Sequence, residues 1–201
     1  MRIIINNISQ SFTILPQRDT VEILNVPISG LKVILPKVFG DHRGYFFESY
    51  NETAFQNAGL PTHFVQDNQS MSHKGALRGM HFQIPPGAQG KLVRVIQGSV
   101  LDVVIDIRKS SPTYGKHFAI ELSGENKKMF WIPEGFAHGF LTLEDNTIFS
   151  YKCTDVYRPD LEMGLPWDDA ELQIDWGVQQ PLLSEKDTQH RSFSGFNSPF
   201  I

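Results

Sequence analysis

The sequence has a single cysteine among its 201 residues, Cys153, so no disulfide can form within the chain. It also lacks a basic excess, because 18 Lys and Arg stand against 22 Asp and Glu, for a formal net charge of -4. Proteins that bind a nucleic-acid backbone normally carry clustered basic charge, so this balance argues against a nucleic-acid partner. A lone cysteine fits a reducing compartment, and we expect a cytoplasmic protein.

Long apolar runs are missing as well. The first residues include Ile3, Ile4 and Ile5, but this run is far shorter than a signal-peptide core or a membrane span. No membrane partner is therefore expected. Residues 1–20 show little periodicity and are interpreted as an amino-terminal extension, and no repeat or linker divides residues 21–201, which we predict to be one domain.

Short apolar and β-branched runs separated by glycine and proline begin at Val21 and indicate an all-β sandwich or barrel. Strands are expected at 31–35, 45–50, 63–70, 77–83, 92–97, 100–107, 118–122, 130–132, 136–143 and 147–154. One interior helix is predicted after Asn51, a good helix cap, and it should stop at Gly59-Leu60-Pro61. From about Leu161 the chain should wrap the barrel as irregular structure with short helical turns.

Two segments resemble the paired signatures of cupins, which are antiparallel jelly-roll barrels. The first is His81-Phe82-Gln83 followed by Lys91, and the second is 133–138, which ends in His138. A metal-binding cupin would be expected to have His, His and Glu where this chain has His81, Gln83 and Lys91. The cation of Lys91 would repel a divalent metal in that pocket, so we predict no metal cofactor there. Lys91 could instead supply the positive charge that a metal supplies in other cupins.

Longer motifs narrow the resemblance to one family. They are Asp41-His42-Arg43-Gly44, Gln66-Asp67-Asn68-Gln69-Ser70, the strand at 77–83, Lys91-Leu92-Val93, and the segments 132–140 and 151–157. In this order they closely resemble the dTDP-4-dehydrorhamnose 3,5-epimerases, from about Val21 to Asp187. The resemblance implies an all-β, cupin-type antiparallel jelly-roll barrel with a few short peripheral helices.

The resemblance also implies a reaction: conversion of dTDP-4-dehydro-6-deoxy-D-glucose to dTDP-4-dehydro-L-rhamnose without a cofactor, in dTDP-L-rhamnose biosynthesis. The two inverted carbons, C3 and C5, both lie beside the C4 ketone. Removing either proton gives an enolate, so the enzyme needs a base, a cation or donor at the C4 oxygen, and an acid on the opposite face. A homodimer whose amino-terminal strands exchange between subunits is implied too.

Site residues follow from the resemblance. His81 resembles the base, Asp187 the carboxylate that orients it, Tyr151 the opposing acid and Lys91 the cation at the enolate oxygen. The other substrate contacts that the resemblance implies are Arg43, Glu48, Gln66, Asn68, Arg78, His138, Glu162 and Lys186. Arginine suits a diphosphate because its planar fork donates two parallel hydrogen bonds.

These residues also have purely structural interpretations. Without the resemblance, His81 is a hydrogen-bonded barrel histidine, Tyr151 a packed strand tyrosine and Lys91 a solvent-facing strand lysine. In a regular strand Arg78 and His81 point to opposite faces, so a twist or bulge near Gly79 is needed if both reach the substrate. The residues Phe46, Phe47, Phe136 and Phe140 are expected in the core, with stacking on thymine as the alternative.

Three other functions stay open from the sequence. The nearest is an epimerase that inverts only C3 or C5 of a deoxysugar nucleotide, since one base and one acid serve both carbons. The second is a metal-dependent cupin, which bound metal and loss of activity on chelation would reveal. The third is a non-catalytic sugar-binding barrel, which would have no need of the acid and base formed by Tyr151 and His81.

Overall fold

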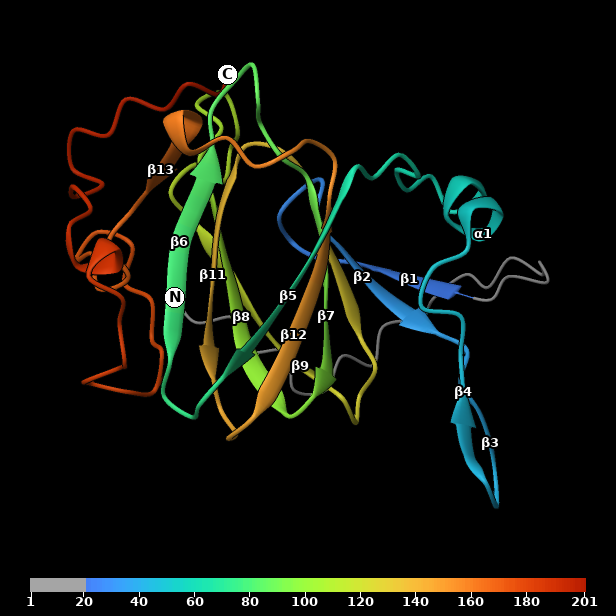
Figure 1. The fold of residues 1–201 in the computed structure, drawn as a ribbon. Helices are drawn as coiled ribbons and strands as arrows, with labels where there is room; N and C mark the ends of the chain where they lie inside the picture. The colour runs from blue at the N-terminus through green and yellow to red at the C-terminus, as the bar shows by residue number, and fades with distance from the viewer. Residues whose placement is uncertain (1–20) are drawn as a thin grey trace.

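The computed structural model describes residues 21–201, and the predicted extension at 1–20 lies outside the described residues. Two antiparallel sheets face each other (Figure 1). The larger contains, in spatial order, β1 (Val21–Asn25), β2 (Lys32–Pro36), β10 (Met129–Ile132), β7 (Lys91–Gln97), β12 (Thr147–Cys153) and β5 (Gln66–Ser72). The smaller contains β13 (Glu162–Gly164), β6 (Leu77–Gln83), β11 (Phe136–Thr142), β8 (Ser99–Asp106) and β9 (His117–Ser123). The prediction of an all-β antiparallel jelly roll is confirmed.

A two-stranded hairpin, β3 (Phe39–Asp41) and β4 (Gly44–Phe46), extends away from the two sheets (Figure 1). The strand expected at 45–50 is wrong beyond Phe46, where β4 ends. Phe46 is also exposed, at 65% of its surface, so its predicted place in the core is wrong for the single chain. All residues of the two strands are exposed, so they lack the alternating burial that identifies strands from sequence.

Most other predictions agree with the structure to within a few residues, and β6 has the predicted bounds. Helix α1 (Glu52–Asn57) begins where expected, because the side chain of Asn51 accepts a hydrogen bond from the Ala54 amide at 3.0 Å. The carboxy-terminal region is mostly irregular, with the 3₁₀ helices η1 (Pro159–Leu161) and η2 (Lys186–Thr188). Strand β13 was not predicted there, and neither were β1 and β3 elsewhere.

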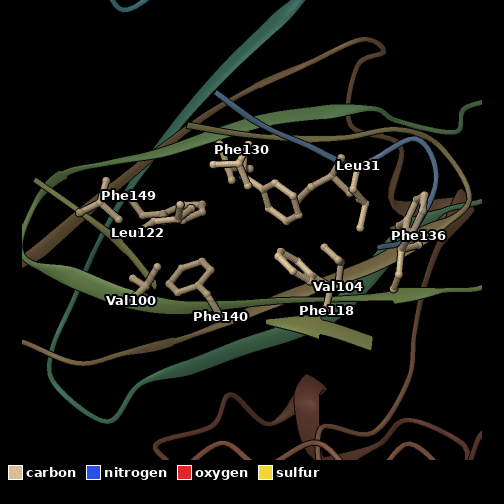
Figure 2. Close-up of a cluster of buried hydrophobic side chains, with 14 residues drawn as sticks. Leu31, Val100, Val104, Phe118, Leu122, Phe130, Phe136, Phe140 and Phe149 are labelled. Carbon is tan, nitrogen blue, oxygen red and sulfur yellow. The ribbon is translucent and has the colours of Figure 1, made fainter. Parts of the chain in front are cut away.

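The main core lies between the sheets, where inward-facing side chains from both meet (Figure 2). Phe130 of the larger sheet packs on Phe118 of the smaller, with ring centroids 5.7 Å apart. Phe136 and Phe140 are buried here as predicted. Complete burial of aromatic and branched side chains is the main stabilising contribution in such a sandwich.

Each sheet also buries part of its outer face. Met80 and Phe82 of β6 point away from the central core and pack with residues of the carboxy-terminal region, such as Leu172 and Trp176. On the larger sheet, Phe55 of helix α1 packs in a cluster with Leu92, Trp131 and other outward-facing residues. The alternation along β6 therefore leaves its inward side chains free to line the space between the sheets.

Within residues 21–201, none of the helices has both the length and the apolar character that crossing a membrane requires.

Candidate active site

A cavity of about 520 Å³ opens between the two sheets, next to the apolar core. It is lined from the smaller sheet by Arg78, His81, His138 and Phe140, from the larger by Asn68, Lys91, Phe149 and Tyr151, and from the carboxy-terminal region by Ser184 and Asp187. The structure thus brings together seven of the predicted site residues, namely Asn68, Arg78, His81, Lys91, His138, Tyr151 and Asp187.

An irregularity in β6 allows Arg78 and His81 to share this cavity. His81 pairs with His138 and Arg78 with Phe140, so three steps along β6 correspond to two along β11. Gly79 lies in the extra step with φ +122°, and a Cβ atom there would stand 2.5 Å from the Cα atom of Gly139. Only glycine fits such a position, so the irregularity expected near Gly79 is present as a bulge.

His81 is held by a carboxylate. Its Nε2 lies 2.6 Å from Oδ1 of Asp187, while Ser184 donates to Oδ2 of the same carboxylate at 2.8 Å. Burial of Asp187 would raise its pKa, but the hydrogen bonds with His81 and Ser184 and the charge of His81 outweigh it, and the pKa lies below its usual value. Asp187 therefore stays ionised and orients the ring, which leaves Nδ1 of His81 to accept a proton.

Tyr151 and Lys91 reach the cavity from the facing sheet. Tyr151 pairs with Val93, and Cys153 pairs with Lys91, so the two cavity residues lie on adjacent strands one pleat apart. Burial raises the pKa of Tyr151, although the charge of Arg78 opposes this, and the phenol keeps its proton. Burial lowers the pKa of Lys91. A neighbouring oxygen that gains negative charge would favour the ammonium form of Lys91, and the ammonium would in turn stabilise that charge.

His138 lies directly opposite His81 in the register of β11 and β6. Its Nε2 is 2.9 Å from Oδ2 of Asp102, a carboxylate with no exposed surface on the neighbouring strand β8. A buried carboxylate fixes the orientation of this ring as Asp187 fixes that of His81. His138 is therefore a rigid polar group in the cavity wall.

A second cavity of about 310 Å³ adjoins the first and shares His81, Lys91, Asn68 and Tyr151 with it. Gln66 and Glu162, both predicted substrate contacts, line it. The Glu162 carboxylate accepts a hydrogen bond from the hydroxyl of Tyr157 at 2.5 Å and forms an ion pair with Lys186. Lys186 thus reaches the edge of the site through Glu162, with half of its side chain exposed.

Gln83, which stands where a metal-binding cupin would be expected to have a histidine, has a structural role. Its amide donates to the Gly87 carbonyl at 2.6 Å and accepts from the backbone of Arg158 at 2.6 Å. Gln83 therefore joins two loops, a task that needs both a donor and an acceptor, which neither a carboxylate nor a metal-bound histidine offers.

Comparisons with known proteins identify the family of the chain. The family model of dTDP-4-dehydrorhamnose 3,5-epimerase matches residues 25–195. The chain belongs to the dTDP-4-dehydrorhamnose 3,5-epimerase family. It is 55% identical over 161 residues to the Pseudomonas aeruginosa member, covering 79% of this chain and 88% of the relative. The Shigella flexneri member is 51% identical over 172 residues, covering 85% and 95%.

The fold of the family is shared in full. The crystal structure of dTDP-6-deoxy-D-glucose-3,5-epimerase from Legionella pneumophila in complex with dTDP-4-keto-L-rhamnose aligns with a TM-score of 0.86 at 45% identity. The alignment covers 90% of this chain and 98% of that one. The family predicted from the motifs is therefore confirmed, as are the cupin-type jelly roll and the assignment as an isomerase.

Two predicted site residues of this epimerase lie away from both cavities. Arg43 is on the β3–β4 hairpin, where its guanidinium pairs with Asp41 and 79% of its side chain is exposed. Glu48 follows the hairpin and accepts a hydrogen bond from Asn51 at 3.0 Å. In the single chain neither side chain lines the space that contains His81.

Some residues around the site were not predicted, although two carried a signal. Asp102 is a carboxylate at an inward position of an apolar strand, a placement that requires a partner. Ser184 precedes Asp187 by three residues, and its hydroxyl accepts from the Asp187 amide at 3.3 Å, a recognisable local turn. His190 lies 3.7 Å from Asp187, and nothing in the sequence around it predicts that contact.

Proposed function

We propose that this chain inverts C3 and C5 of dTDP-4-dehydro-6-deoxy-D-glucose, giving dTDP-4-dehydro-L-rhamnose for dTDP-L-rhamnose biosynthesis. One observation carries the proposal: His81, backed by the buried Asp187, shares a cavity with Tyr151 of the facing sheet. An acid and a base presented from opposite walls suit proton removal from one face of a sugar and proton return to the other. A sugar-binding barrel has no need of an acid and a base on opposite walls of its cavity.

The proposed reaction begins with transfer of the C3 or C5 proton to Nδ1 of His81. The electron pair of the broken C–H bond moves into an enolate whose negative charge rests on the C4 oxygen, beside Lys91. Tyr151 then donates its phenolic proton to the opposite face of the same carbon, and the enolate returns to the ketone. His81 releases its proton to solvent and Tyr151 regains one, so the cycle consumes nothing and needs no cofactor.

Binding of the nucleotide sugar is assigned to the remaining polar residues of the two cavities. Arg78 and His138 offer positive or hydrogen-bonding groups near the reacting ring, while Gln66, Asn68, Glu162 and Lys186 extend the polar surface outward. A fixed guanidinium next to a cavity of this kind suits a diphosphate.

Arg43 and Glu48 contribute through a homodimer in this proposal. The β3–β4 hairpin carries Arg43 away from its own barrel (Figure 1), and Phe39, Tyr45 and Phe46 on it are each more than half exposed. Exposed aromatic residues on a projecting hairpin favour burial against a second chain.

The single, buried Cys153 fits a reducing compartment, and we place the enzyme in the cytoplasm.

Proton NMR in D₂O tests the proposal. When the enzyme acts on dTDP-4-dehydro-6-deoxy-D-glucose, deuterium should enter at both C3 and C5, and both carbons should invert. Deuterium at one carbon only would establish a single-site epimerase instead. Binding of the sugar nucleotide without any exchange would establish a binding protein, and activity lost on chelation and restored by metal would establish a metal enzyme.

A further inference from the structure

Three side chains with metal-binding atoms meet on the Asp187 side of His81. Nε2 of His81 lies 2.6 Å from Oδ1 of Asp187, and Nε2 of His190 lies 3.7 Å from the same oxygen. One ligand atom from each of the three residues lies within 4.8 Å of the others. The reaction proposed above uses His81 and Asp187 but gives His190 no part.

The position of His190 is built into the fold. Its side chain is only 11% exposed, and its Nε2 is buried without a hydrogen-bond partner among residues 21–201. Gly164 of β13, which pairs with His81, makes room for the ring, because a Cβ atom at Gly164 would stand 2.3 Å from Cε1 of His190. A buried ring nitrogen that points at a carboxylate from beyond hydrogen-bond distance is costly unless a ligand occupies the gap.

A separate cavity of about 610 Å³ gives access to this place. His190 and Asp187 line it, together with Asp168 and Asp169. Carboxylates on the walls of a cavity raise the local concentration of cations. A cation can therefore approach the His190 side of Asp187 without first entering the substrate cavity.

We propose that His81, Asp187 and His190 form an inhibitory site for a divalent transition metal ion, with Zn²⁺ as the best fit. Two imidazole nitrogens and one carboxylate are a common zinc ligand set, with bonds of about 2.0–2.2 Å and water as a fourth ligand. Tetrahedral geometry with such bonds separates the ligand atoms by about 3.3 Å. The His81–Asp187 contact would open by about 0.7 Å from 2.6 Å, and the His190–Asp187 contact would close by about 0.4 Å from 3.7 Å.

Binding at this site would stop the reaction by occupying the base. The metal would take the place of the proton between Nε2 of His81 and Asp187, and the neutral imidazole that binds it would carry its one ring proton on Nδ1 instead. With Nδ1 already protonated, His81 could not accept the C3 or C5 proton of the substrate. This inhibition rests on the proposed role of His81, whereas metal binding does not. The site differs from the cupin metal position, where Gln83 and Lys91 stand.

Isothermal titration of the chelator-treated full chain with ZnCl₂ tests the binding. The wild type should bind one ion per chain, and H190A should bind at least ~10-fold more weakly, as loss of a ligand predicts. H73A is the matched control, because His73 lies 3.8 Å from Asp145 at the surface and its loss should leave the affinity unchanged. Absence of stoichiometric binding by the wild type would overturn the proposal, as would equal affinities of the wild type and H190A.

Two further variants keep the test decisive if H190A folds poorly. G164A, which retains every ligand, should also weaken binding because the added methyl group displaces the His190 ring. H138Q should bind Zn²⁺ like the wild type, since His138 lies on the inner wall of the barrel. Loss of binding in H138Q with retention in G164A and H190A would put the ion inside the barrel and contradict the proposed site.

The inhibition is measured as C3 and C5 proton exchange, each protein being compared with its own rate in chelator. Zn²⁺ should stop exchange in the wild type and in H73A, chelator should restore it, and H190A should need at least ~10-fold more metal. Stoichiometric binding that leaves exchange unchanged would contradict the inhibitory role. If no protein shows exchange even in chelator, the proposed function fails, while the titrations still decide the metal site.

Discussion

The interior of the barrel has two halves of opposite character, and the same strands supply both. Strand β7 contributes Val93 and Val95 to the apolar half and Lys91 to the cavity. In the same way β12 contributes Phe149 to the core and, two residues on, Tyr151 to the site. Stability and chemistry therefore share one scaffold: the apolar half fixes the strands, and the strands then hold the polar side chains in place.

The two halves should respond differently to substitution, and the largest effect should be H81N. Asparagine keeps a polar group of similar reach but cannot take the proton, so kcat should fall about 10³-fold or more. The substrate dissociation constant and the free energy of unfolding should change little. Steady-state kinetics and a denaturant titration check this prediction. If kcat fell only in proportion to the fraction of folded protein, the two halves would not differ in the way proposed.

In the apolar half, F130A should produce the reverse pattern. Phe130 is fully buried, so truncation should lower the free energy of unfolding by about 3–5 kcal/mol through lost burial and a new cavity. The kcat of the molecules that remain folded should stay close to that of the wild type, because Phe130 does not line the site. Urea titration and single-temperature kinetics make the measurement, and kcat falling as far as in H81N would contradict it.

Asp187 shares a property with each half, because it is buried like the core residues and yet lines the cavity of the polar half. The pKa of Asp187 is lowered in the folded state, so the ionised carboxylate stabilises the fold. This stabilisation is fully present above the usual carboxyl pKa of about 4 and is lost as the pH falls through the lower pKa of the folded state. D187N should therefore cost about 1.5–3 kcal/mol near neutral pH, as expected for a charge-assisted hydrogen bond. The difference between the two proteins should shrink below pH ~4. Urea titrations across this range decide the point, and a constant difference would show that Asp187 is not ionised.

The smallest effect on stability should come from R43A. Arg43 and Asp41 form an exposed pair on the hairpin, so the loss of Arg43 should leave the free energy of unfolding nearly unchanged. If a partner subunit receives this hairpin, KM for the nucleotide sugar should nevertheless rise, with kcat nearly unchanged. An unaltered KM would remove Arg43 from the site and with it the proposed role of the hairpin.

The sequence predicts which residues form the polar half better than it predicts how they are arranged in space. Motif order placed His81, Tyr151, Lys91 and Asp187 in one site, and the parity of β6 even required a twist or bulge near Gly79, where the structure contains a bulge. The bulge itself depends on contact with Gly139 of another strand, which no local pattern encodes. Strand β13 is too short and too polar for periodicity to reveal it.

His190 shows the same limit at the end of the chain. Its contact with Asp187 depends on how an irregular segment folds back over β13, a matter of tertiary packing and not of local propensity. Arg43 shows the opposite case, because the motif predicts a role that a single chain does not explain. Both residues are understood only from what lies next to them in space.

The opposed acid and base can be separated by measuring proton removal and proton return independently. In Y151F the proposed base on one wall of the cavity remains and the proposed acid on the other is lost, while the ring still packs between the strands. In D₂O, Y151F should replace the C3 and C5 protons of dTDP-4-dehydro-6-deoxy-D-glucose with deuterium that is delivered largely to the original face. Inversion at the wild-type rate would contradict the opposed acid and base on which the account depends.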